Sequence, residues 1–199
     1  MPVVTLPPGA VPRALDAGFI DNGGWQRGPL GGAATRVDRM GSRYKAAFAF
    51  PPFQSKDLGR IVVSRLIRAQ RLGIRMEYPL GDFHPGAPGQ PVVDGNGQAG
   101  AALNVRGFTP GYAVREGQWF NQVRGDDVLL YNVAAPAVAN GSGVALIQFE
   151  PMLRVEPLDG DVLQLARPEI QGMVVGDERR WSMALERLIA IEFEVEEFV

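Results

Sequence analysis

Residues 187–196, with the sequence RLIAIEFEVE, decide the fold of this chain. Apolar and acidic side chains alternate along the stretch, which is typical of a β-strand with one buried and one solvated face. The inward positions are Ile189, Ile191, Phe193 and Val195, and the outward positions are Glu192, Glu194 and Glu196. A lone strand at the end of a chain needs an earlier sheet to bury its apolar side. We therefore expect it to pair with the unit at residues 36–78, which makes the middle of the chain an insertion.

Residues 36–78 read as a β-helix-β unit. Residues 36–50 predict one or two strands around the Gly41-Ser42 turn, and every second residue from Tyr44 to Phe50 lies on one apolar face. A helix is expected from a Ser55 cap to Leu72, with apolar residues three and four apart on one side. That side is formed by Leu58, Ile61, Val62, Leu66 and Ala69. Gly73 ends the helix, and residues 74–78 form the next strand.

The remaining segments complete a mainly β prediction. The first thirty or so residues are dense in Gly and Pro, which break both helix and strand ladder, so we expect an extended arm. From Gly81 to Gly111 the composition again favours loops, and short strands with turns between them follow, without a helical pattern. We predict a β-sandwich or β-barrel hub domain, residues 1–81 and 169–199, with one flanking α-helix. Residues 82–168 are predicted to form an inserted small antiparallel β-barrel module.

Charge is divided unevenly along the chain, although the net charge is only −2. Residues 1–80 carry 12 Lys and Arg against 5 Asp and Glu, giving +7, whereas residues 81–199 carry 8 against 17, giving −9. The simple interpretation is two solvated faces of unlike sign. A more specific interpretation is that oppositely charged surfaces of neighbouring copies meet in a ring, because complementary electrostatic potentials orient two proteins as they associate. The apolar runs are too short to span a membrane and the N-terminus lacks signal-peptide features, so we expect a soluble protein made in the cytoplasm.

Catalytic and metal-binding signals are weak. His84 is the single histidine and lies in a Pro/Gly loop, and no cysteine is present. The acidic pairs Asp126-Asp127 and Glu196-Glu197 occur where turns and solvated strand faces normally collect acids, so a glycosidase pair is unsupported. No Gly-rich phosphate loop or Gly-x-Ser-x-Gly sequence occurs. We expect neither catalytic residues nor a metal or cofactor.

Two groups of segments resemble distal tail proteins of siphophages and related prophages. Residues 32–52, leading into the helix, resemble the hub segment of that family. A small β-module inserted in such proteins is similar to residues 109–120, followed by 140–146, 150–154 and 159–162. The resemblance implies a hexameric ring with a central lumen and a peripheral module. In the virion, the ring would join the tail tube to the tail-tip or baseplate hub and the receptor-binding apparatus. DNA would pass through the lumen without sequence-specific contact.

The charge asymmetry suggests which residues contact a neighbour in such a ring. Basic residues of the hairpin and helix would meet the glutamates of the last strand in another copy or in a partner ring. The candidates are Arg36, Arg39, Arg43, Arg60, Arg68, Arg71, Glu192, Glu194 and Glu196. Two alternatives remain open. One is another minor tail-tip or head-to-tail connector protein, and the other is a cell-wall glycan-binding or glycan-cleaving protein.

Overall fold

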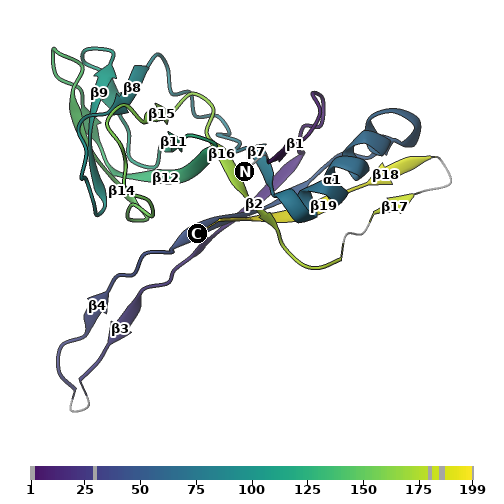
Figure 1. The fold of residues 1–199 in the computed structure, drawn as a ribbon, viewed down its shortest axis with the longest axis horizontal. Helices are drawn as coiled ribbons and strands as arrows, with labels where there is room; N and C mark the ends of the chain where they lie inside the picture. Colours follow the sequence, from purple (N-terminus) through teal and green to yellow (C-terminus); the bar gives the residue numbers. More distant parts are fainter. Residues whose placement is uncertain (1–2, 29–30, 179–180, 184–186, 199) are drawn as a thin grey trace.

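The computed structural model describes residues 3–28, 31–178, 181–183 and 187–198. It consists of a six-stranded sheet with a helix on one face, a closed six-stranded barrel beside that sheet, and a long two-stranded arm that projects away from both (Figure 1). Within these residues there is a single α-helix, and the barrel is antiparallel. The expected fold class, mainly β with one helix and a small antiparallel barrel, is thus confirmed.

The six-stranded sheet is built from both ends of the chain. In spatial order its strands are β1 (Val4–Thr5), β7 (Ile74–Glu77), β16 (Glu169–Val174), β19 (Glu192–Glu197), β5 (Arg43–Ala49) and β2 (Ala14–Ile20). The last strand, β19, is antiparallel to β5, with Phe193 opposite Phe48. The predicted pairing of the C-terminal strand with the early part of the chain is therefore confirmed.

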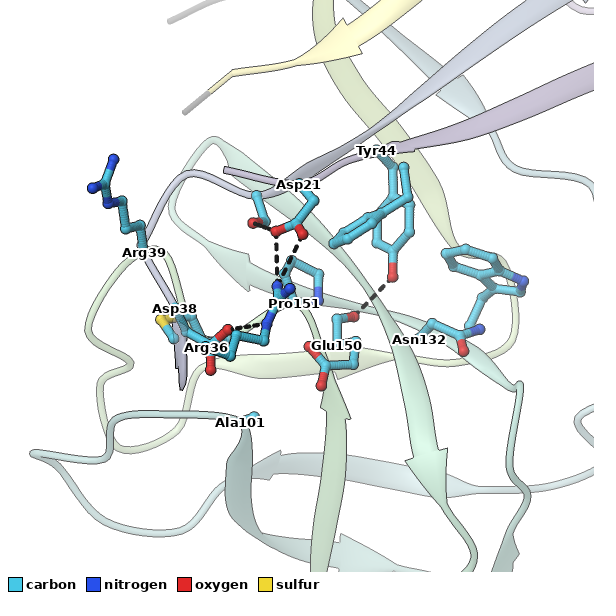
Figure 2. A pocket seen from close by; sticks show the side chains of 13 residues that line it. Asp21, Arg36, Asp38, Arg39, Tyr44, Ala101, Asn132, Glu150 and Pro151 are labelled. Carbon is cyan, nitrogen blue, oxygen red and sulfur yellow. Dashed lines mark hydrogen bonds and ion pairs between the residues drawn. The ribbon is translucent and has the colours of Figure 1, made fainter. Parts of the chain in front are cut away.

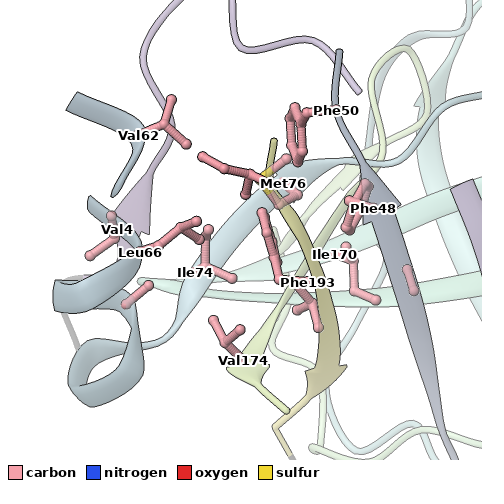
Figure 3. Close-up of a cluster of buried hydrophobic side chains, with 14 of the residues drawn as sticks. Val4, Phe48, Phe50, Val62, Leu66, Ile74, Met76, Ile170, Val174 and Phe193 are labelled. Carbon is pink, nitrogen blue, oxygen red and sulfur yellow. The ribbon is translucent and has the colours of Figure 1, made fainter. Parts of the chain in front are cut away.

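The helix α1 (Arg60–Leu72) packs on one face of this sheet. Its buried side chains Val62, Leu66 and Ala69 belong to one apolar core with residues of β1, β7, β16, β5 and β19. Figure 3 shows Leu66 in this core with Val4 and Ile74. Full burial of a Val or Leu side chain contributes roughly 1.5–3 kcal/mol, so this layer is a main source of stability.

The ends of α1 only partly match the prediction. Ser55 does not cap it, because residues Ser55–Gly59 form a separate π-helical segment, η1, in which Asp57 has non-helical dihedral angles. Ile61, predicted on the apolar side, is 40% exposed. The end at Gly73 is as expected: its φ is 76° and its N–H donates to the carbonyl oxygen of Ala69 at 2.8 Å.

The single strand predicted for residues 187–196 is in fact two strands in two sheets. β18 (Leu188–Ala190) pairs with β17 (Ser182–Met183) and β6 (Phe53–Gln54), whereas β19 pairs with β5. The reason lies in the partner, since Pro51 and Pro52 interrupt the chain between β5 and β6, and proline cannot donate to a ladder. All four inward residues are nevertheless buried, as predicted.

The arm differs from the expectation in two ways. Within this Gly- and Pro-rich N-terminal segment, β2 does form a ladder, because it contains no proline and pairs with β5 at seven positions. Beyond the sheet the two strands continue as β3 (Gly24–Gln26) and β4 (Thr35–Val37), which pair with each other. Gly41-Ser42 is therefore not the hairpin turn but a bend in the returning segment of the arm, between β4 and β5. Asn22, in the opposite segment between β2 and β3, stabilises this bend. Its side chain donates to the Gly41 carbonyl at 2.9 Å, and its backbone N–H donates to Ser42 Oγ at 3.1 Å.

The barrel contains the segments between β7 and β16. Its strands, in spatial order, are β11 (Trp119–Arg124), β12 (Asp127–Ala135), β14 (Ala145–Glu150), β9 (Ala102–Phe108), β8 (Gly89–Val93) and β15 (Val162–Gln164). β10 (Ala113–Val114) and β13 (Ala137–Val138) form a small extra pair. Phe120, Tyr131 and Phe149 fill the interior with ring centroids 5.0–5.6 Å apart. This core is separate from that of the large sheet.

Candidate functional site at the junction of arm, sheet and barrel

The barrel is fixed to the sheet by apolar and polar contacts. Trp119 of β11 lies against Tyr44 of β5 and Tyr78, with ring centroids 4.8 and 4.5 Å apart. Asn121 of β11 accepts from the N–H of Glu169 at 2.6 Å and donates to its carbonyl at 2.8 Å. These contacts join β11 to both β5 and β16, so the barrel is held at more than one point.

A buried ion pair lies at the centre of this junction. Arg154 donates from both terminal nitrogens to the carboxylate of Glu197, at 2.8 and 3.0 Å, and the two side chains are only 2% and 1% exposed. The carboxylate also accepts the N–H groups of Tyr44 and Leu130, each at 2.8 Å. Burial disfavours the charge on Arg154, but Glu197 outweighs it, and the pKa of Arg154 is raised above its ordinary value. One carboxylate thus connects the sheet, the barrel and the loop that follows β14.

A pocket of about 640 Å³ opens between the arm and the barrel (Figure 2). On the arm side Arg36 makes two 2.9 Å hydrogen bonds to Asp21 and one of 2.5 Å to Asp38. The N–H of Gly23 and then Arg36 lower the pKa of Asp21, and the two carboxylates raise the pKa of Arg36. On the sheet side the hydroxyl of Tyr44 donates to the Glu150 carbonyl at 2.9 Å. The rim is therefore preorganised by contacts within the chain.

The glutamates predicted for a ring contact pair with cations of their own chain. On the open face of the sheet Glu196 binds Arg43 at 2.8 Å, Glu194 binds Lys45 at 2.9 Å and Glu192 lies 3.9 Å from Arg13. The contacts of Arg43 and Lys45 are cross-strand pairs that stabilise β19 against β5. Arg13 precedes β2, which is not adjacent to β19. Whether the same glutamates also contact another copy stays a prediction.

The predicted arginines lie in three places. Arg43 is on the open sheet face, Arg36 and Arg39 line the pocket, and Arg60, Arg68 and Arg71 are exposed on α1. The structure thus brings Arg36 together with Arg39 and Arg43 with Glu196, but it does not bring the helix arginines to the glutamates.

Two carboxylates face each other where the chain passes between sheet and barrel. Glu77 and Glu169 are directly opposite on β7 and β16. Burial and then the nearby Glu77 raise the pKa of Glu169 above its ordinary value of 4.5, against the opposing effect of Arg75. A folded-state pKa above the unfolded one means that stability falls as the pH rises from 4.5 through the raised value.

We expect Glu77→Gln to stabilise the protein at neutral pH by roughly 0.5–1 kcal/mol, because like charges directly opposite are destabilising. The loss of stability as the pH rises through this window should also become smaller. Urea denaturation at several pH values measures both effects. Glu116→Gln in the barrel serves as a control, and equal behaviour of the two variants would contradict the assignment.

No metal site or membrane helix emerges from the part of the chain that the structure describes. No group of three or more His, Asp or Glu residues there is arranged to hold a metal ion. Nor is any helix in those ranges long and apolar enough to cross a membrane. Comparison of the sequence with protein-family models and with curated proteins gives no match.

Proposed function

We propose that this chain is a structural protein of a tailed-phage particle, a distal tail protein that forms a ring joining the tail tube to the tail tip. Its partners would be further copies of itself, the tail tube protein and the tail-tip or baseplate hub proteins. DNA would pass through the lumen. The proposal specifies a distal tail protein because residues 32–52 and the module segments resemble that family.

The observation that carries the proposal is the arm. Residues 21–28 and 31–40 are almost entirely exposed, and Trp25 and Met40 have exposed fractions of 63% and 70%. A two-stranded hairpin without a core is marginally stable in water by itself. Large apolar side chains on such a hairpin are explained if another molecule covers them.

The edges of the six-stranded sheet support a ring more than a symmetric dimer. One edge is the seven-residue strand β2 and the other is the two-residue strand β1. Open edges are templates for pairing with another chain. Contact between two unlike edges is head-to-tail, and such contacts close into rings when the rotation between copies permits.

Shortening the arm tests the proposal. A variant in which a two-residue Asn-Gly turn replaces residues 22–41 should keep its fold, since Asn-Gly suits a tight hairpin. We expect the intact chain to form a ring and this variant to remain monomeric in light scattering and electron microscopy. Trp25→Ala should weaken assembly, whereas Trp181→Ala outside the arm should not. A monomeric intact chain, or a ring formed equally well without the arm, would refute the proposal.

A further inference from the structure

We propose that the pocket between the arm and the barrel binds a neutral saccharide unit. This inference does not depend on ring formation, because every side chain it uses comes from one copy of the chain. The pocket volume of about 640 Å³ lies within the usual range of small-molecule sites, roughly 300–1,000 Å³.

The barrel contributes a row of three side chains to the pocket. Trp119 on β11 is directly opposite Asn132 on β12, and Asn132 is directly opposite Glu150 on β14. Residues that are opposite in neighbouring strands share one face of the sheet. An aromatic ring, an amide and a carboxylate thus lie side by side across three strands, and all three line the pocket.

The aromatic part of the pocket extends from the barrel to strands β5 and β2 of the sheet. Tyr44 contacts Trp119 edge-on, with ring centroids 4.8 Å apart, and lies 5.3 Å from Phe19 on the other side. Phe19 is 47% exposed and also lines the pocket. Aromatic rings provide rigid apolar surface next to polar groups, which suits a ligand with apolar C–H faces.

The charges in the lining favour an uncharged ligand. Three carboxylates, Asp21, Asp38 and Glu150, are accompanied by the guanidinium groups of Arg36 and Arg39. An anion would approach the carboxylates and a cation would approach the arginines, so neither sign is clearly favoured. A purely apolar ligand would remove these five groups from water without replacing their hydrogen bonds.

A saccharide meets each of these conditions. Its hydroxyl groups both donate and accept, as a mixed lining of carboxylates, guanidinium groups and an amide requires. Asn132 is already oriented, because its Nδ2 donates to the Gly117 carbonyl at 2.9 Å, and its Oδ1 can accept a hydroxyl proton. The C–H faces of the sugar ring can lie against Phe19 and Trp119.

Saturation-transfer NMR on the full chain tests this inference, with maltotriose and the N-acetylglucosamine trimer as neutral probes. We expect transfer to ring C–H protons at millimolar affinity, and about tenfold weaker binding for Phe19→Ala and Glu150→Gln. The matched controls, Phe198→Ala and Glu156→Gln, lie outside the pocket and should bind like the unmodified chain. Glu150→Gln changes little in shape, so it remains informative if Phe19→Ala misfolds.

Three results would overturn the inference. The first is no transfer to either neutral probe, or transfer that both pocket variants leave unchanged. The second is equal or stronger binding of glucuronate or uridine, which would assign the pocket to an anion or a base. The third is saccharide binding that is lost at protein concentrations where the intact chain assembles, which would indicate that a second copy fills the pocket. Light scattering on the same samples reports assembly separately, so failure of the ring and failure of saccharide binding are distinguishable.

Discussion

Glu197→Ala is expected to destabilise the protein by about 3–5 kcal/mol, because it leaves the buried guanidinium of Arg154 without its counter-charge. The same change removes the acceptor of the Tyr44 and Leu130 N–H groups, and each buried donor left unpaired adds roughly 1–3 kcal/mol. Since domains are stable by only about 5–15 kcal/mol, the variant should be largely unfolded near room temperature or just above it. Urea denaturation followed by circular dichroism and tryptophan fluorescence measures the loss.

The neighbouring residue provides the control for this prediction. Glu196→Ala removes a carboxylate from the same strand, but its pair with Arg43 is partly solvated, with both side chains 19% exposed. Its cost should be about 1 kcal/mol or less. The double variant Arg154→Met with Glu197→Met should lose less than Glu197→Ala alone, since no unpaired charge remains. Similar costs for Glu196→Ala and Glu197→Ala would show that the buried pair is not structurally important.

Gly172→Ala is expected to cost about 3 kcal/mol or more, because a methyl group does not fit at the centre of the sheet. A Cβ built at Gly172 lies 1.8 Å from the carbonyl oxygen of Glu196 and 2.5 Å from its carbonyl carbon. The obstacle is the backbone of β19 rather than a flexible side chain, so β16 and β19 would have to separate. Hydrogen exchange should show reduced protection of the β19 amides, and the melting temperature should fall.

Gly141 is the matched control for Gly172. A Cβ at Gly141 has no atom within 4 Å. Gly141→Ala should therefore change stability by no more than about 0.5 kcal/mol. If Gly172→Ala were equally mild, the close packing of β16 against β19 would be wrong.

Regular alternation made much of the sheet predictable. The apolar face of residues 44–50 and the inward residues of the C-terminal stretch were identified from a period of two, and both are buried. Several barrel strands could be identified because turns separate short apolar runs, as in the hairpin at Gly125 and Asp126. The barrel strand β8 was not predicted, because it lies in the Gly- and Pro-rich stretch that was interpreted as a loop. The path of the arm was not predictable, because β2, with the sequence ALDAGFI, alternates poorly and lies among Gly and Pro.

The ion pair between Arg154 and Glu197 was not predicted, although the sequence pattern indicates one of its two partners. Continuing the alternation Phe193, Val195 by one step places Glu197 on the inward side, yet the Glu196-Glu197 pair was interpreted as solvated. An acid at an inward position requires a buried partner. Arg154 follows Pro151 in an irregular segment without periodicity, so only the folded chain reveals it as that partner.

The barrel leaves the sheet and rejoins it on two adjacent strands, with the N–H of Tyr78 bonded to the carbonyl of Pro168 at 2.8 Å. A short turn could connect the end of β7 directly to the start of β16. Residues 79–167 could therefore be exchanged for a different domain without changing the topology of the sheet. Glu197 limits which domains would be accepted. A replacement domain without an arginine at the position of Arg154 would leave the buried carboxylate of Glu197 unpaired. Exchange of this domain during evolution would therefore favour domains that carry a suitably placed cation.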